Sequence, residues 1–247
     1  RLVDPLCAFI PILHNTLESL SGWPDPYLDV YTTKAGMYRE QFSMSDGFTT
    51  MYEAYSLNAS FKNIINDPIS MLFQYWTTYA QLVREGEMDP YPSSILENEI
   101  DYNTRIYRLI LDPSKRFVMR IGACGAAFPK SINLGSAYNF KADAPFNLDL
   151  NNISVEFQMM GAMYQDPILV YEFNECVCIF NPAMRDKYRD TYMVKLDLRQ
   201  RRLFNYQGYP RINRKNMELE WYVTKQTYAE TIKRVRRLDP TYPILTR

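Results

Sequence analysis

Apolar and polar residues alternate most regularly over residues 103–121, and the rest of the chain is organised around this stretch. Arg105, Tyr107 and Leu109 recur at every second position, so one face of a strand carries them and the other face carries the residues between them. The run is interrupted at residues 112–115, where an Asp bonds onward to its own backbone and a Pro presets φ at about −65°. The pattern predicts a long β-hairpin with two different faces.

Further segments carry strand patterns on both sides of this hairpin. Residues 36–44 and 52–62 are separated by the turn signal Ser45-Asp46-Gly47. Residues 152–163 resemble them in pattern. Residues 168–180 are almost all apolar or aromatic, which is typical of a strand buried on both faces, so we expect a central strand there.

The clearest helix pattern follows Asp67. Asp67 is a suitable N-cap with Pro68 at the first helical position, and Gly86 is a suitable end. Apolar residues recur at three- and four-residue spacing and form one predicted face, which comprises Met71, Leu72, Tyr75, Trp76, Tyr79 and Leu82. We expect this helix to cover a sheet and interpret its aromatic stripe as core.

Three stretches read as irregular. Prolines interrupt residues 1–35, where we expect a short helix within residues 12–20 and an aromatic connector that either docks on a partner or packs on its own domain. Residues 122–129 are small until Phe128-Pro129, which we interpret as a fixed corner. Residues 130–150 show little periodicity, and so long a loop is commonly functional or ordered by a partner.

The C-terminal part begins at the predicted boundary Asn181-Pro182. Beyond it we expect short strands at 192–198 and 218–223 and a basic helix at 227–238, with basic loops at 199–202 and 211–215. The predicted division is an N-terminal arm (1–35), a β domain (36–182) and a basic extension (183–247). The predicted fold class is α+β, mainly β: an antiparallel sheet or barrel with one covering helix and a long hairpin.

Charge is balanced over the whole chain but unevenly distributed. The 28 basic and 28 acidic residues give no overall field that selects a nucleic acid or a membrane. Residues 183–247 hold 16 basic and 7 acidic residues, a net charge of +9, and the preceding 182 residues have a net charge of −9. A segment opposite in sign to the rest of its chain favours self-association or packing back onto that chain.

The four cysteines are not spaced as a metal or disulfide framework. Cys176 and Cys178 would point to one face of a strand, where pairing is geometrically poor. We therefore expect reduced thiols and a reducing compartment. No apolar run approaches the ~18 residues that would span a bilayer.

Residues suited to catalysis are scarce. His14 is the only histidine, so a nucleophile with a histidine base would depend on it. Clustered His or Cys ligands for a metal are not apparent, and we expect no cofactor. An acidic stretch at residues 85–101 has the carboxylates that glycoside hydrolysis uses, but it is rich in proline and reads better as a solvated face.

The basic segment interleaves cations and aromatic residues between Arg201 and Lys215. Such a pattern suits stacking on bases and contact with phosphate. Because the preceding part of the chain is acidic and would repel DNA, we favour docking on protein, through Arg201, Arg202, Arg211, Arg214 and Lys215.

The order of elements resembles the tail-tube fold of contractile bacteriophage tails. The resemblance rests on residues 102–122, on Gly125-Ala-Ala-Phe-Pro-Lys-Ser131 and on Ile153-Ser-Val-Glu-Phe-Gln158, within residues 36–180. It implies a non-enzymatic virion protein that forms a homo-hexameric ring and builds a channel for DNA passage. The basic extension favours a tube initiator or baseplate-hub component over the repeated tube protein.

The resemblance also implies where contacts form. The hairpin is expected to face a subunit or the channel through Arg105, Tyr107, Arg108, Asp112, Pro113, Lys115 and Arg116. Phe128, Pro129 and Lys130 are expected to form an interface loop. Neighbouring tail, hub or baseplate proteins are the expected partners, DNA is only passing cargo, no membrane is involved, and assembly takes place in the host cytoplasm.

Two other functions remain open at this stage. One is a different virion connector, such as a neck or baseplate-wedge subunit. The other is a carboxylate-dependent glycan hydrolase that uses the acidic stretch. Activity on a polysaccharide substrate would separate the enzyme from both structural functions.

Overall fold

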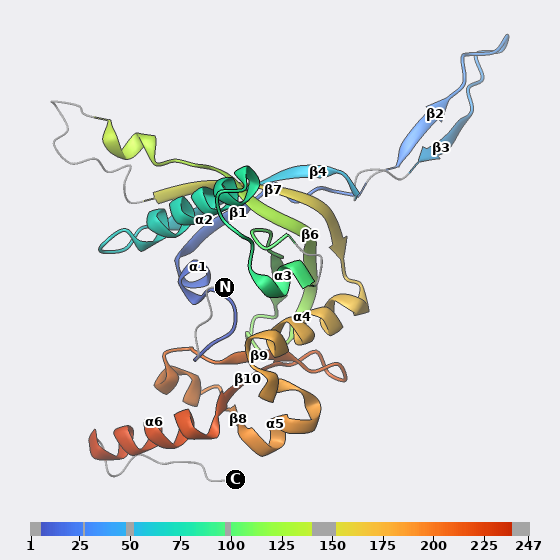
Figure 1. The fold of residues 1–247 in the computed structure, drawn as a ribbon. Helices are drawn as coiled ribbons and strands as arrows, with labels where there is room; N and C mark the ends of the chain where they lie inside the picture. Colours follow the sequence, from blue (N-terminus) through green and yellow to red (C-terminus); the bar gives the residue numbers. More distant parts are fainter. Residues whose placement is uncertain (1–5, 27, 48–51, 97–99, 140–151, 239–247) are drawn as a thin grey trace. The chain divides into compact units, whose positions relative to one another are not determined.

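The computed structural model describes residues 6–26, 28–47, 52–96, 100–139 and 152–238 (Figure 1). Contacts divide the chain into two compact units. The small-sheet unit comprises Arg1–His14, Arg108–Ile121 and Gln165–Arg247, and the large-sheet unit comprises Asn15–Tyr107 and Gly122–Tyr164. The three-part division expected from composition stays a prediction.

The described residues form both strands and helices. The strands are β1 (Leu17–Ser21), β2 (Asp29–Thr32), β3 (Ser43–Gly47), β4 (Ala54–Lys62), β5 (Tyr107–Leu111), β6 (Val118–Ile132), β7 (Asn152–Tyr164), β8 (Met193–Leu196), β9 (Tyr209–Ile212) and β10 (Leu219–Thr224). The helices are α1 (Pro11–Thr16), α2 (Pro68–Glu85), α3 (Pro92–Leu96), α4 (Pro167–Phe180), α5 (Asp186–Tyr192) and α6 (Lys225–Leu238), with 3-10 turns η2 (Gly135–Tyr138), η4 (Pro182–Met184) and η5 (Gln200–Phe204).

The five-stranded sheet has the order β1-β4-β7-β6-β5 and curls along its length (Figure 1). β4 and β7 pair antiparallel over nine residues, with Leu57 opposite Phe157 and Phe61 opposite Ile153. These four side chains are buried, and the residues between them point to the other face. The predicted fold class, mainly β with a covering helix and a long hairpin, is confirmed.

Helix α2 covers the apolar face of this sheet, as predicted. Phe73 is fully buried, and its ring lies 5.5 Å from that of Phe61 and 5.7 Å from that of Phe157. Gly86 ends the helix in a left-handed conformation with φ 77°. Asp67 does stand at the N-cap, but at φ 50° its side chain makes no capping hydrogen bond.

The buried face of α2 is rotated from the predicted one. Met71 and Tyr75 are 53 % and 70 % exposed, whereas Ile69 and Phe73, which the predicted face omitted, are fully buried. Trp76 is half-buried and donates its indole N–H to the backbone oxygen of Tyr102 at 2.8 Å. Met71 and Tyr75 are four residues apart, as are the buried Ile69 and Phe73. Periodicity alone therefore could not show which of these two pairs faces the core.

Strand β6 is longer than predicted, and it includes Phe128-Pro129, where a corner was expected. Gly125 allows the close approach of β7 there, because a Cβ at this position would lie 2.9 Å from the backbone oxygen of Met160. Pro129 is paired with Phe157, and the register shifts directly after it. The shift frees the proline from the hydrogen-bonding ladder, so a Phe-Pro pair that reads as a corner lies inside a strand.

The expected central strand at residues 168–180 is wrong, because this segment forms helix α4. The Asp166 side chain accepts a hydrogen bond from the N–H of Ile168 at 2.9 Å, and Pro167 occupies the first helical position. Buried residues on α4 follow helical spacing, at Leu169, Phe173 and Val177 among others. The prediction failed because the helix is apolar on both sides, which hides a 3.6-residue period.

The expected strand at residues 36–44 is also wrong. Strands β2 and β3 form a two-stranded hairpin whose tip contains most of this segment. Ser45, Asp46 and Gly47, predicted as a turn, lie in β3. The backbone N–H of Gly36 bonds to Glu40, which closes the actual turn at 3.0 Å.

The N-terminal segment is less irregular than predicted. The helix expected within residues 12–20 exists only as α1, after which β1 pairs with β4. The following connector packs within the large-sheet unit: the ring of Trp23 lies 6.0 Å from that of Tyr164, whose hydroxyl donates to the backbone oxygen of Pro24 at 2.7 Å. Of the two roles expected for the connector, the structure shows packing on its own unit.

The small-sheet unit is built on the order β8-β10-β9. Leu196, Phe204 and Val223 form its core, with Tyr228 of α6 stacked on Phe204 at 5.7 Å. The predicted strands near 192–198 and 218–223 are confirmed as β8 and β10, and the terminal helix as α6. Of the expected basic loops, one is largely the turn η5 and the other begins in β9.

The carboxamide of Asn174 on α4 is bound along the outer strand of this sheet. Its nitrogen donates to the backbone oxygen of Ile212, and its oxygen accepts from the N–H of the same residue, both at 2.9 Å. The side chain thus occupies the place that a neighbouring strand would take on β9.

The cysteines agree with the expectation of reduced thiols. All four are free in the structure. Cys7, Cys124 and Cys178 are buried, and Cys176 is half-buried.

Candidate functional site

The uncovered face of the five-stranded sheet is composed of small polar residues. Ser56, Asn58 and Ser60 alternate with buried residues along β4, and the registers set them opposite residues of the same kind on β1 and β7. We call this surface the polar face; it comprises Ser19, Ser21, Ser56, Asn58, Ser60, Ser154, Glu156 and Gln158, with Lys62 and Asn152 at one end and Met160 at the other. Strand alternation makes the sheet apolar toward α2 and hydroxyl- and amide-rich on the opposite side.

Glu156 is the carboxylate of the polar face, and it is neutralised locally. It accepts hydrogen bonds from Ser56 Oγ at 2.8 Å, Lys130 Nζ at 3.0 Å and Ser131 Oγ at 3.3 Å. The hydrogen bond from Ser56, followed by that from Lys130, lowers the pKa of this carboxyl below its ordinary value. The middle of the face therefore presents an ion pair among uncharged groups, and Lys62 at its end is the further charge that the pairing of β4 with β7 puts there.

The two outer strands of this sheet are β1 and β5. β1 is only five residues long and pairs with the last part of β4. Outer strands carry backbone groups that face away from the sheet and are suited to pairing with another chain.

The predicted hairpin exists, and its arms are placed as the alternation indicated. Tyr107 is half-buried and Arg108 is exposed on the opposite side of β5. Arg105, before the strand, donates its Nε–H to the backbone oxygen of Gly125 at 3.2 Å. Their predicted role in a channel or subunit contact stays a prediction.

Asp112 organises the turn of the hairpin. Its carboxylate accepts hydrogen bonds from the hydroxyl of Ser114 and from the N–H groups of Arg116 and Phe117, both at 2.9 Å. These bonds, that of the Ser114 hydroxyl first, lower the pKa of Asp112 to about 2. Pro113 is exposed, and Lys115 closes the turn in a left-handed conformation with φ 55°.

Beyond this turn the hairpin is bound within the small-sheet unit. Arg116 contacts Glu218 with an Nε–Oε1 distance of 2.9 Å. The N–H of Val118 donates to the backbone oxygen of Met217 at 2.8 Å, and Phe117 forms an isolated antiparallel bridge with Glu218, directly before β10. Arg116, predicted for a contact between subunits, is thus already paired within its own chain.

The residues predicted as an interface loop lie in β6 rather than in a loop. Pro129 is buried, Phe128 is 37 % exposed, and Lys130 is bound to Glu156 beside the polar face. Part of the long loop predicted after them, residues 140–150, lies outside the described residues. The expected role of these three residues in an interface stays a prediction.

Two of the predicted docking cations are bound inside the small-sheet unit. Arg211 contacts Asp186 at 2.9 Å and Glu220 at 3.3 Å. The guanidinium of Arg201 lies over the ring of Trp221, 5.8 Å from its centre, and burial lowers its pKa. Both side chains hold the fold together.

The other three docking cations are exposed. Arg202 lies 3.4 Å from the hydroxyl of Tyr206, and Arg214 lies over the ring of Tyr171, 4.8 Å from its centre. Lys215 follows on the same exposed turn. The role of these three residues in docking stays a prediction.

Glu220 is the centre of an ionic cluster that the sequence did not reveal. It is 5 % exposed and accepts hydrogen bonds from Lys195, Asn213, Arg211 and Tyr222, at 2.8 to 3.3 Å. Burial alone would raise the pKa of this carboxyl, but these hydrogen bonds and the charge of Lys195 hold it below its ordinary value. The alternation of Leu219 to Val223 marked a strand without showing that a carboxylate would lie inside.

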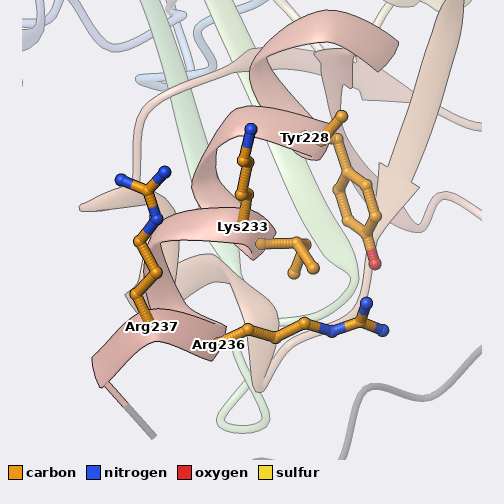
Figure 2. A pocket seen from close by; sticks show the side chains of 6 residues that line it. Tyr228, Lys233, Arg236 and Arg237 are labelled. Carbon is orange, nitrogen blue, oxygen red and sulfur yellow. The ribbon is translucent and has the colours of Figure 1, made fainter. Parts of the chain in front are cut away.

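A groove of about 610 Å³ runs beside α6 (Figure 2). It is lined by Tyr228, Ala229, Ile232, Lys233, Arg236 and Arg237. All six residues come from one helix, so the groove is an open surface rather than the enclosed apolar cavity that small-molecule sites usually have. Its cations add to the positive charge of the small-sheet unit.

Within the part of the chain that the structure describes, no three His, Cys, Asp or Glu side chains are grouped to hold a metal ion. Among those same residues no helix is long and apolar enough to cross a membrane. His14, on which a histidine-dependent mechanism would rest, lies on α1 against the ring of Phe9 at 6.2 Å.

Comparison with protein families decides the relationship of the chain. The family described as "Putative phage tail tube protein" matches residues 2–237, nearly the whole sequence. The chain belongs to this family. The resemblance that rested on residues 102–122 and on two shorter segments, 125–131 and 153–158, is thereby confirmed. The tail tube protein has a structural role in a phage tail.

Two solved structures are similar to this tail tube protein. The anti-feeding prophage cap (AFP tube terminating cap) is 13 % identical, with 60 % of this chain and 79 % of that chain covered and a TM-score of 0.37. The PVC sheath/tube terminator of an extracellular contractile injection system, in the extended state, is 10 % identical, with 61 % and 85 % covered and a TM-score of 0.34. A search of the curated proteins found no match.

Proposed function

We propose that this tail tube protein forms a homo-hexameric ring in which the polar face lines the channel of a contractile tail. The observation that carries the proposal is the chemical difference between the two faces of one sheet. One face is sealed by the aromatic contacts of Phe73 on α2, and the other carries mainly hydroxyls and amides around the Glu156–Lys130 ion pair. A face that is solvated and uncovered in the subunit is suited to a water-filled channel.

The composition of the polar face also suits passage of DNA as cargo. Lysine and arginine side chains neutralise phosphates and retain DNA, and each such contact strengthens binding. On the polar face Lys130 is already paired with Glu156, and Ser, Asn and Gln occupy most of the other positions. Lys62, at the end of β4 opposite Asn152, adds one exposed cation to this face. Such a wall solvates the DNA without fixing it.

The outer strands β1 and β5 complete the proposal. In a ring, β5 of one copy pairs with β1 of the next, so that the open sheet of each subunit becomes a segment of a closed barrel. Closure removes the free strand edges that would otherwise invite uncontrolled pairing. Six copies related by rotation give a head-to-tail arrangement of this kind.

The positive charge of the small-sheet unit supports a position at an end of the tube, as a tube initiator or hub-type component. Its exposed cations Arg202, Arg214 and Lys215 dock on a neighbouring tail or baseplate protein rather than on DNA. The number of copies per particle tests this position: an end component is present as one or a few rings, whereas the repeated tube protein is far more abundant. Quantitative mass spectrometry of purified particles gives that number, and DNA binding by the isolated protein at about 0.15 M salt tests the docking role.

The channel assignment is tested by cysteine labelling in assembled rings. Ser154→Cys places a thiol on the polar face, and Met71→Cys places a matched control on the exposed side of α2, both in a Cys176→Ser background. In monomers a bulky polyethylene-glycol maleimide is expected to label both positions. In rings it is expected to label only position 71, whereas a small maleimide still reaches position 154.

Native mass spectrometry of the same samples reports the number of copies per ring. Equal labelling of both positions by the bulky reagent in rings would show that the polar face lies outside the channel. A protein that stays monomeric at all concentrations, and in mixtures with its neighbouring tail proteins, would contradict the ring itself.

A further inference from the structure

The β2–β3 hairpin, here called the arm (residues 29–47), is a ribbon with two unlike faces. Tyr31 pairs with Met44, and Phe42 lies two residues before Met44, so these three side chains share one face. Thr32 and Ser43 lie on the other, with their hydroxyl oxygens 3.0 Å apart. The arm is therefore apolar on one side and hydroxylated on the other.

The apolar face of the arm is uncovered. Tyr31, Phe42 and Met44 are 54 %, 68 % and 59 % exposed, and Met37 and Tyr38 at the tip are 89 % and 88 % exposed. A two-stranded hairpin alone is marginally stable in water, and an amphipathic ribbon gains stability when its apolar side lies on another surface. These exposed apolar side chains suit the arm to binding on the surface of a partner.

Helix α4 presents a matching surface in the small-sheet unit. Ile168, Tyr171 and Ile179 follow helical spacing on its outer side and are 50 %, 49 % and 62 % exposed. The inner side, with Phe173 and Val177, is buried. The same outer side also carries the exposed carboxylate of Glu175, one turn after Tyr171. This outer stripe of α4 is thus apolar toward both ends of the helix, and the described residues of the small-sheet unit leave it exposed.

The areas and lengths of the two surfaces agree. An aromatic side chain buries about 150–250 Å², so the rings and methionines of the arm supply several hundred square ångströms. That is of the order of the roughly 800 Å² that one partner contributes to a standard interface. At a rise of about 1.5 Å per residue, Ile168 and Ile179 are about 16 Å apart along α4, which a strand covers in about five residues.

Charge favours a contact between unlike units of two copies. The large-sheet unit, which carries the arm, has 7 basic and 16 acidic residues, a net charge of −9. The small-sheet unit, which carries α4, has 21 basic and 12 acidic residues, a net charge of +9. Contacts between like units repel, and contacts between unlike units attract.

We propose that the apolar face of the arm docks on the outer stripe of α4 in a second copy of this chain. This inference rests on the proposed ring, because it takes the partner to be another subunit. Arg214, which lies over Tyr171 at the stripe, meets the carboxylates of Glu40 and Asp46 on the arm. The cations of the arm, Lys34 and Arg39, are available to Glu175 on the stripe. The arm thus links successive copies through a contact separate from the strand edges.

Photo-crosslinking tests the contact directly. Phe42 is replaced by p-benzoylphenylalanine, and Val30, exposed at 61 % and on the hydroxylated side of the arm, receives the same replacement as a control. Proteins grown with light and heavy nitrogen are mixed, assembled and irradiated, and the linked peptides are mapped by mass spectrometry. The expected result is a mixed-isotope link from position 42 to residues 167–180, and none from position 30.

The outcomes separate this inference from the proposed function. Rings that form with links from position 42 to other segments, or with links of unmixed isotope only, overturn the arm contact and leave the ring intact. A preparation without rings contradicts the proposed function itself. Crosslinking of position 42 to a different tail protein in whole particles, without a link to α4, also overturns the proposal.

Substitutions give a second measurement. Phe42→Ser and Ile179→Ser are each expected to weaken self-association by about tenfold or more, and together by little more than either alone, because both remove one contact. Val30→Ser is the matched control and is expected to leave association unchanged. Circular dichroism confirms that each variant folds, and fully additive effects of the two substitutions would contradict a shared contact.

Discussion

The two sheets of this protein place a glutamate on a strand in opposite ways. On β7, Glu156 lies on the solvated face and is balanced by Lys130. On β10, Glu220 is buried and is surrounded by Lys195, Arg211 and other donors. The large sheet takes its stability from the apolar face opposite its charges, whereas the small sheet carries its charges inside.

This difference reflects the depth of the apolar core available to each sheet. The nine-residue pairing of β4 and β7 offers a long row of apolar side chains to α2. The strands of the small sheet are only four to six residues long, and its core cluster is correspondingly small. A buried and hydrogen-bonded carboxylate then fixes how the strands meet, at the cost of desolvating its charge.

The largest effect is expected at the apolar contact of the large sheet. Phe73→Ala removes the fully buried ring that touches Phe61 and Phe157, and should lower the free energy of unfolding by about 3–5 kcal/mol. Denaturant melts measure this loss. Tyr75→Ala, on the exposed side of the same helix, should change it by less than about 0.5 kcal/mol, and equal effects would show that α2 does not seal the sheet through Phe73.

The next largest effect is expected at the buried carboxylate of the small sheet. Glu220→Ala leaves Lys195 and Arg211 without their shared acceptor, and a hydrogen bond to a charged group contributes about 1.5–3 kcal/mol. We expect a loss of about 2–3 kcal/mol in unfolding free energy, measured by denaturant melts. Glu230→Ala, on the surface of α6, is the control, and a loss no greater than that of this control would contradict a structural role for the cluster.

A smaller effect, and one that depends on pH, is expected at the hairpin turn. The pKa of Asp112 is lowered to about 2 from an ordinary value of 3.8, so its carboxylate stabilises the folded state fully above about pH 4. This contribution is lost as the pH falls toward 2. Thermal melts of Asp112→Asn should therefore lie below those of the unchanged protein at pH 6 and approach them at low pH, and a difference independent of pH would contradict the assignment.

The smallest effect on stability is expected on the polar face. Glu156→Gln keeps the shape of the side chain and removes a half-exposed ion pair at the surface of the sheet, and surface pairs contribute little to folding. Its melting temperature should match that of the unchanged protein within error. A clear loss of stability would mean that Glu156 behaves like Glu220 and that the two sheets do not differ in this respect.

The sequence predicted those elements whose pattern had a single explanation. The hairpin around Asp112, the strand β7 and the helix between Asp67 and Gly86 were all visible as alternation, turn residues or caps. Helix α4 was mistaken for a strand because its apolar residues lie on both sides, and the proline in β6 suggested a corner because the register shift that accommodates it is invisible in one sequence.

The candidate site was less predictable than the fold. Strand alternation in β4 and β7 contained the polar face, but assembling it required the register that sets Asn58 opposite Glu156. The cluster around Glu220 gathers residues from β8, β9 and β10, which no local pattern connects. Among the predicted docking cations, only the structure separates Arg211, which is bound inside, from Arg214, which is exposed.

The bound carboxamide of Asn174 affects how the chain behaves before any ring exists. Newly made copies meet one another at high local concentration. An exposed strand edge that pairs with the backbone of another chain can then start aggregation. The side chain of Asn174 satisfies the backbone N–H and oxygen of Ile212 on the outer edge of β9. These two groups are therefore not available to pair with another chain. A single side chain thereby discourages mispairing at this edge during synthesis.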